Sequence, residues 1–135
     1  MATISAIRDG LQTVGAAITG LRSLDTIRGE ISPPCLVAVP ENAEPKTLVG
    51  TRDRLNFRLR LMVSSESERT AQDALDGYLS STGDTSVRAK LQLPANANLG
   101  IAGVKAIWMG WENYGLAEWS GITYFGADVL IQVEN

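Results

Sequence analysis

The chain has 135 residues, of which 44% are hydrophobic and 20% are charged, and its formal net charge at pH 7 is -3. This length and composition predict one globular domain and exclude a disordered chain, and no apolar run approaches the ~20 residues that span a bilayer. The negative charge disfavours tight binding of nucleic acid, which usually requires a basic excess on one face.

The chain contains a single cysteine, Cys35, which cannot form an internal disulfide. The first residues lack the basic start and the continuous apolar stretch of a signal peptide. We therefore expect the chain to fold in a reducing cytoplasm, without contact with a membrane.

The first predicted element is an amphipathic helix from Thr3, a suitable N-cap, to about Gly20. Its apolar residues recur at spacings of three and four, and we expect this stripe to pack on a sheet. The stripe consists of Ile4, Ile7, Leu11, Val14, Ile18 and Leu21. The weaker pattern of residues 24–32, with Ile27 and Ile31 around Gly29, predicts a short edge strand.

Two strands are predicted next. Residues 35–39 (CLVAV) form a continuous apolar run stopped by Pro40, which is typical of a buried strand. Residues 54–63 (RLNFRLRLMV) alternate apolar and polar side chains, which indicates a central strand with one packed face and one wet face. Between them, residues 41–53 predict a long loop, either a mobile surface loop or an arm that orders against a neighbouring subunit.

Two helices are expected after the central strand. Ser65 and Glu68 form a capping box, which marks the start of the first helix. One face of this helix is apolar, consisting of Ala71, Ala74, Leu75, Tyr78 and Leu79. Gly83 can supply its left-handed C-terminal cap. Asp84 or Thr85 could then cap a short helix through Val87 and Leu91, before a loop over residues 94–100.

The last third of the chain predicts a hairpin of two long strands. In the first strand, over residues 104–114, Trp108 is expected on one face and Ile107, Met109 and Trp111 on the other. Residues 115–121 are expected to form the bend. The second strand starts at Ile122, with Phe125, Ala127, Val129, Ile131 and Val133 inward and Asp128, Gln132 and Glu134 outward. The predicted fold is therefore a single α+β domain, 1–135, with a mixed, mostly antiparallel sheet and helices packed on one face.

Four arginines are expected to project from one face of the central strand and its approach: Arg52, Arg54, Arg58 and Arg60. Three interpretations of this arginine row remain open. The side chains could be solvated or paired with Asp128 and Glu134 of the last strand, could form salt bridges between subunits, or could touch the phosphates of passing DNA.

Six of the eight aromatic residues lie between positions 108 and 125. Such a cluster is either the end of the core or an association surface, because aromatic residues are enriched at interfaces. Trp108, Trp111 and Trp119 are therefore candidate interface residues, together with the arginine row.

The sequence offers no chemistry that is typical of an enzyme. It has no histidine, no nucleotide-binding or nucleophile motif and no metal-ligand spacing. Cys35 lies in an apolar run without an evident activating base, and Asp73 and Asp76 are expected on a solvated helix face. We expect no catalytic, metal-binding or cofactor-binding residues.

Three segments of the chain carry a resemblance to a known family. They are SPPCLVAVP at 32–40, RLNFRLRLMVSSESERTAQDALDGYLSSTGD at 54–84 and YFGADVLIQVEN at 124–135. With the N-terminal helix, their order resembles the tail terminator proteins of long-tailed actinobacteriophages (siphophages), also described as head-to-tail connector or minor tail proteins. The resemblance spans nearly the whole chain and consists of patterns rather than a signature motif.

The resemblance implies a virion structural protein of the tail-neck junction with a mixed sheet and helices on one side. Its expected partners are copies of itself, which would form a ring of six, the tail tube protein and the head-completion or neck protein. DNA would only pass through the bore. The ring would stop tail growth because it binds the last tube ring with one face and presents a different face outward.

Two alternatives remain open at the level of sequence. The chain could be another ring of the neck or tail, such as a head-completion (stopper) protein or a tail-tube subunit. It could instead be a cellular module that binds a peptide or a small ligand through the aromatic hairpin, which predicts a monomer with a concave apolar pocket.

Overall fold

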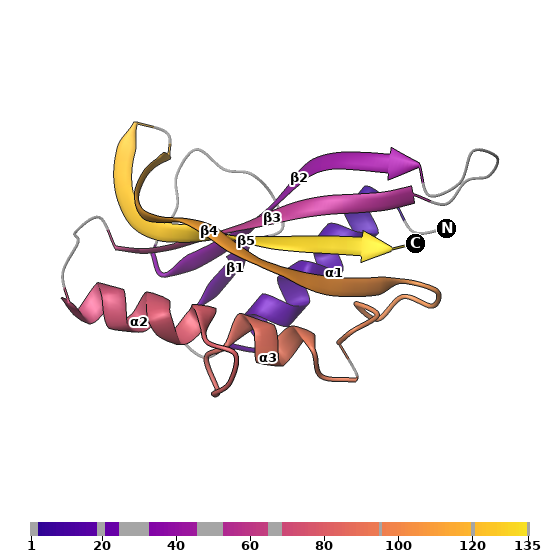
Figure 1. Cartoon of the computed structure of the whole chain (residues 1–135), viewed down its shortest axis with the longest axis horizontal. Coiled ribbons are helices and arrows are strands. Elements are labelled where there is room, and N and C mark those ends of the chain that lie inside the picture. Colours follow the sequence, from indigo (N-terminus) through magenta and orange to yellow (C-terminus); the bar gives the residue numbers. More distant parts are fainter. Residues whose placement is uncertain are drawn as a thin grey trace.

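A computed structural model describes residues 3–18, 21–24, 33–45, 53–64, 69–94, 96–119 and 121–134. Within these ranges the chain forms three helices and one five-stranded sheet (Figure 1). The helices are α1 (Ile4–Ala16), α2 (Arg69–Leu79) and α3 (Val87–Leu91). The strands are β1 (Arg22–Leu24), β2 (Cys35–Pro45), β3 (Asp53–Ser64), β4 (Lys105–Trp119) and β5 (Ile122–Glu134). None of the helices in these ranges is both long and apolar enough to cross a lipid bilayer.

The sheet has the strand order β1-β2-β3-β5-β4. Only the short β1 runs parallel to its neighbour β2, and the other three pairings are antiparallel. This arrangement confirms the predicted class, an α+β domain with a mixed, mostly antiparallel sheet. The central strand is β3, flanked by β2 and β5 over almost its whole length.

The main core lies between the helices and one face of the sheet, which we call the helix face. Leu55, Phe57, Leu59 and Leu61 of β3 point into it because alternate residues of a strand share a face. All three helices contribute buried residues to the same cluster, among them Ile7, Leu11, Leu75 and Leu91. The prediction that the helices cover one face of the sheet is therefore confirmed.

The opposite side of the sheet, which we call the open face, carries a second and smaller apolar cluster. Cys35, Val37 and Met62 are buried there beneath Trp119 and Tyr124. Trp119 and Tyr124 come from the β4-β5 hairpin, whose tip curls away from the plane of the sheet (Figure 1). The run CLVAV is thus buried on both faces, as its uninterrupted apolar character predicts.

The helix ends follow their capping residues. Thr3 caps α1 as predicted, since its Oγ1 accepts a hydrogen bond from the Ala6 N–H at 3.1 Å. The helix ends at Ala16, before the predicted Gly20. The capping box at residues 65–68 lies outside the described residues. Ala74, expected in the core, is exposed, while its neighbour Leu75 is buried.

The short helix α3 begins one or two residues later than the two predicted caps, Thr85 and Asp84, would place it. Its cap is the buried Ser86, which satisfies two backbone groups: its Oγ accepts from the Ala89 N–H at 3.0 Å and donates to the Ser80 carbonyl. Asp84 and Thr85 do not cap the helix. Gly83 has the expected positive φ of +106°, but it lies four residues after α2 ends at Leu79 and belongs to the connection between the two helices.

The predicted loop at residues 41–53 is shorter than expected. Strand β2 continues past Pro40 to Pro45, with a register shift between Pro40 and Asn42 where Glu41 is inserted, and β3 already starts at Asp53. The rest of that loop, residues 46–52, lies outside the described residues. So does the edge strand predicted around Gly29, whereas β1 forms at residues 22–24.

Strand β4 continues to Trp119, so most of the predicted bend at 115–121 is strand. Trp119 pairs with Ile122, and Gly121, just before Ile122, has a φ of +84°. Register shifts interrupt β4 between Trp108 and Gly110 and again before Gly115. The first shift changes the parity of the strand, so that Trp111 pairs with the inward-facing Val129 and lies on the helix face with Trp108. The prediction that these two tryptophans face opposite sides is wrong.

Candidate interaction surfaces

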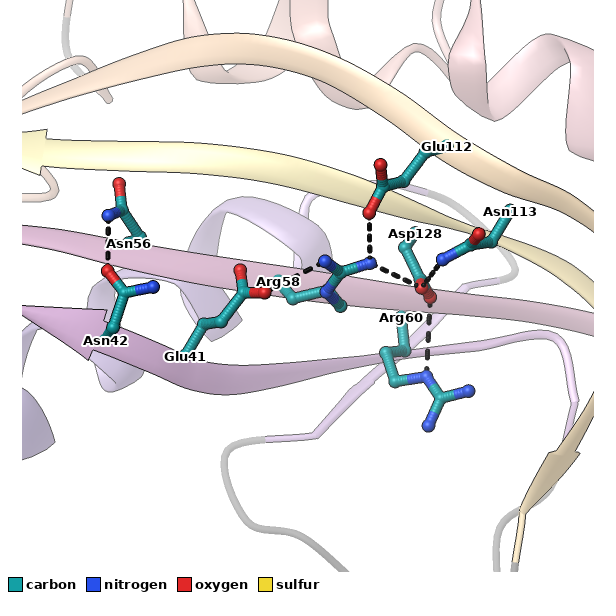
Figure 2. Close-up of polar contacts among 8 residues, drawn as sticks. All are labelled: Glu41, Asn42, Asn56, Arg58, Arg60, Glu112, Asn113 and Asp128. Carbon is teal, nitrogen blue, oxygen red and sulfur yellow. Dashed lines mark hydrogen bonds and ion pairs between the residues drawn. The ribbon is translucent and has the colours of Figure 1, made fainter.

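The open face is organised around Arg58, in the middle of β3 (Figure 2). Its guanidinium contacts one carboxylate from each of the other three long strands. The N–O distances are 2.9 Å to Glu41 of β2, 2.6 Å to Glu112 of β4 and 2.9 Å to Asp128 of β5. These contacts fix the side chain of Arg58 across four strands of the sheet.

We call Arg58 and its three carboxylate partners the arginine cluster. Asp128 is its buried member, with 8% of its surface exposed. Its carboxylate also accepts a hydrogen bond from the Asn113 side chain at 3.0 Å and lies 3.3 Å from Nε of Arg60. The hydrogen bond with Glu41, followed by that with Asp128, raises the pKa of Arg58 above its ordinary value. The buried carboxylate is thus fully paired, as buried charges require.

The rest of the arginine row is also paired within the chain. Arg54 lies 3.4 Å from Glu134 at the far end of β3, and between the two arginines Asn56 donates to Asn42 Oδ1 at 2.6 Å. Arg52 lies outside the described residues. The predicted pairing of the row with Asp128 and Glu134 is therefore observed for Arg54, Arg58 and Arg60.

Arg60 joins the charged part of the open face to the apolar cluster under the hairpin tip. Its guanidinium carbon lies 5.1 Å from the ring centre of Trp119, within the range of a cation-π interaction. Cys35 is fully buried in the same cluster, and burial raises the pKa of its thiol to about 11. A thiol that stays protonated is a poor nucleophile, and its place in the core agrees with a packing role.

On the helix face, the hairpin and α2 enclose a shallow recess of about 380 Å³, lined by Asp76, Leu79, Ser80, Trp111 and Tyr114. Tyr114 Oη donates to Asp76 Oδ1 at 2.7 Å, and this bond raises the pKa of Tyr114. The Tyr114 ring packs edge-on against Phe125 with the centroids 5.4 Å apart. The recess is therefore a fixed part of the surface, with a carboxylate at its rim.

The three candidate tryptophans lie in three different environments. Trp108 is half-buried against the main core, Trp119 is buried in the smaller cluster, and Trp111 is 49% exposed. Only Trp111 therefore lies on an accessible surface. Near it, β4 exposes two further large apolar side chains, Tyr114 and Leu116, whereas the exposed Met109 lines a recess with Asn56 of the open face.

The carboxylates Glu41 and Glu112 are part of the arginine cluster, but sequence reasoning did not find them. Glu41 lies at a register shift inside a segment that reads as loop, and Glu112 lies between two irregularities of β4. A period-two pattern cannot place residues next to such insertions. The only signal was the excess of acidic residues on strands that could neighbour the arginines.

The described residues contain no group of three or more potential ligands that could hold a metal ion. Their strongest polar constellation, the arginine cluster, consists of saturated ion pairs. No known protein family matches the chain, and neither the curated proteins nor the solved structures provide a match. Inferences about function therefore start from the surfaces described above.

Proposed function

We propose that the chain is a structural protein of a long-tailed phage, a tail terminator whose copies form a ring, with six as the expected number. The ring would cap the finished tail tube and join it to the neck below the capsid. The proposal rests on the family resemblance of the sequence and on one structural observation, the exposed apolar strip of β4. Its action would consist of contacts and would need no reaction.

The apolar strip consists of Trp111, Tyr114 and Leu116, which are 49%, 39% and 62% exposed. Aromatic side chains on a half-exposed surface are typical of binding surfaces, because they bury a large area at a low cost in conformational entropy. Tyr114 is held in place by Phe125 and Asp76, and the Trp111 ring packs against Tyr114 with the centroids 5.8 Å apart. We assign this strip to the contact with the last ring of the tail tube.

The open face supports the proposal through its charge. Arg54, Arg58 and Arg60 are all paired with carboxylates of the same chain. A positive row that is neutralised in this way attracts passing DNA only weakly, as a channel for ejection requires. The formal net charge of -3 acts in the same direction.

The proposal is tested by electron microscopy of the purified chain mixed with tail tubes of a long-tailed actinobacteriophage that were assembled without a terminator. Ring-shaped particles at one end of the tubes are expected. Trp111→Ser and Leu116→Ser should remain folded and lose this capping. Ile122→Ser is the matched control, because Ile122 is 50% exposed and pairs with Trp119 on the open face.

Tubes without end particles would reject the terminator assignment. If the chain alone grew into long tubes, it would be a tail-tube subunit. A monomer at all concentrations, with or without tubes, that binds small ligands in the recess under Trp111 would instead support the binding-module alternative.

A further inference from the structure

The two lateral edges of the sheet differ in charge and in shape. In Figure 1, β2 forms one edge of the right-hand half of the sheet and β4 forms the other. Four residues form a row across this part of the open face, from β2 through β3 and β5 to β4. In that order they are Glu44, Arg54, Glu134 and Lys105. The row alternates in sign, so that it begins with an acid at one edge and ends with a base at the other.

The two ends of the row are available for contact. Glu44 and Lys105 are both exposed, and neither forms an ion pair with another of the described residues. Between them, Arg54 and Glu134 are already paired at 3.4 Å. The two ends are separated by three strand spacings, about 14 Å, and cannot meet within one chain.

The β2 edge carries the acidic residue Glu44 and an apolar recess. The recess has a volume of about 230 Å³ and lies between the start of α1 and the edge strand. Its apolar lining includes Ile4, Pro40 and Phe57, and Glu41 lies at its rim without a lysine or arginine among the lining residues. On its outer side, β2 is covered by β1 only at residues 35–37 among the described residues, so the segment around the recess is accessible there.

The β4 edge carries the basic residue Lys105 and, next to it along the edge, an exposed apolar side chain. Leu93 is 47% exposed and follows α3, whose last turn carries Arg88 and Lys90. Two hydrogen bonds tie this turn to the outer edge of β4: Ala97 N–H donates to the Leu93 carbonyl, and Ala106 N–H donates to the Ala97 carbonyl at 2.8 Å. The exposed Leu93 therefore belongs to a segment that lies along the outer edge of β4, the strand that carries Lys105.

We propose that copies of this chain associate head to tail, with the β2 edge of one copy against the β4 edge of the next. Lys105 then faces Glu44 of the neighbour, and Leu93 enters the recess lined by Ile4 and Pro40. Because the Ala106 N–H is already bonded to the Ala97 carbonyl, we assign the contact beside Lys105 to side chains. Unlike surfaces on opposite edges are the requirement for a closed ring.

This inference rests on the proposed function in one respect only, the closing of the contact into a ring. The test uses Glu44→Cys and Lys105→Cys, which are mixed and treated with a short bis-maleimide, alone and with tail tubes present. A cross-linked dimer is expected only when both variants are present. The double variant should give a ladder of species that ends at the size of the ring. The wild-type chain, whose only cysteine is the buried Cys35, should not react.

Charge exchange gives a second readout that does not depend on cross-linking. Lys105→Glu and Glu44→Lys should each lower the association constant by about tenfold, because each places like charges opposite one another. Combining the two substitutions should restore it. Arg69→Glu is the matched control, since Arg69 is 93% exposed on α2 and lies in neither edge.

The possible failures are distinguishable. If the tubes are capped but the mixed variants do not cross-link, the ring forms through other surfaces and the edge contact is wrong. Cross-linking of Glu44→Cys with itself would indicate a two-fold pair and would also overturn it. If cross-linking and charge rescue succeed but no tube is capped, the contact stands and the terminator function fails.

Discussion

The two faces of strand β3 differ in what stabilises them. On the helix face, Phe57, Leu59 and Leu61 are at most 2% exposed and pack beneath three helices. On the open face, Arg58 and Arg60 lie between them in sequence and are held by carboxylates from neighbouring strands. One strand thus places a dry core and a polar network a single residue apart, as the pleat of a β-strand allows.

The two faces of β3 contribute to different properties: the helix face to the stability of the fold, and the open face to the choice of strand order. Burial of apolar area contributes most of the free energy of folding, whereas ion pairs near the surface add little beyond the cost of their own desolvation. The arginine cluster joins four strands through directional contacts, and we infer that it favours this strand order over others. Substitutions on the two faces should therefore change the free energy of unfolding by different amounts and through different interactions.

The largest effect is expected from the helix face. Phe57→Ala should lower the free energy of unfolding by about 3–5 kcal/mol, because it leaves a cavity among side chains that cannot fully collapse. Urea unfolding followed by circular dichroism measures the change. Asn56→Ala is the control on the other face, where loss of the hydrogen bond to Asn42 should cost about 0.5–1.5 kcal/mol. Equal effects would contradict the assignment of the main core to the helix face.

A smaller effect is expected at the centre of the open face. Arg58→Met keeps the length of the side chain but removes the cation shared by Glu41, Glu112 and Asp128. The expected loss is about 1.5–3 kcal/mol, the range for hydrogen bonds to charged groups. Adding salt should reduce the loss, since it screens the carboxylates that then repel each other.

Arg69→Ala is the control for this prediction. Arg69 is 93% exposed and lies 3.9 Å from Asp73, so its removal should change stability by less than about 0.5 kcal/mol. If Arg58→Met changed the free energy of unfolding as little as Arg69→Ala, the arginine cluster would have no part in holding the strands together.

The same contrast explains how far the fold can be predicted from the sequence. The helix face follows largely from periodicity: the alternation in β3 and β5 and the three-four spacing in α1 identify the residues that become buried, except Ile4, which was expected in the packed stripe but is 48% exposed at the start of α1. The cap at Thr3 is equally local, because it needs only a hydroxyl and the next three residues. These parts are predictable because each is encoded within a short window.

The candidate surfaces depend on interruptions of periodicity, and there prediction failed. An insertion at Glu41 and another before Gly110 shift the register, which brings Glu41 to Arg58 and turns Trp111 to the helix face. Gly110 has a φ of +120°, a conformation that glycine adopts easily, but the sequence alone does not distinguish it from other glycines. The contact of Glu41 with Arg58 and the orientation of Trp111 depend on pairing between strands that are distant in sequence, so a local pattern cannot predict them.

A third prediction concerns the apolar cluster of the open face at alkaline pH. Burial raises the pKa of Cys35 from 9.0 to about 11, so the folded state holds the proton more tightly than the unfolded state. This contribution to stability is complete below pH 9 and is lost as the pH rises from 9 to 11. One pKa unit corresponds to 1.36 kcal/mol, and the wild-type chain should be about 1.4 kcal/mol less stable at pH 10 than at pH 8 on this account.

Cys35→Ala tests this assignment. The variant lacks the thiol and should lose less stability over the same pH interval, measured by urea unfolding at each pH. Burial also raises the pKa of Tyr78, so an alkaline loss should remain in the variant. Identical pH profiles of the two proteins would show that Cys35 ionises as easily in the folded chain as in the unfolded one.

The smallest effect is expected at the rim of the recess on the helix face, where a change in ionisation should leave the fold intact. Asp76 accepts the hydrogen bond of Tyr114 and raises its pKa. Asp76→Asn should therefore move the ionisation of Tyr114 to lower pH, which is measured by ultraviolet absorbance and assigned by comparison with Tyr114→Phe. Asp84→Asn is the control, because Asp84 is not among the residues that act on Tyr114. An unchanged midpoint would mean that Asp76 does not hold Tyr114. The apolar strip would then lack the rigidity that its proposed role in binding the tail tube requires.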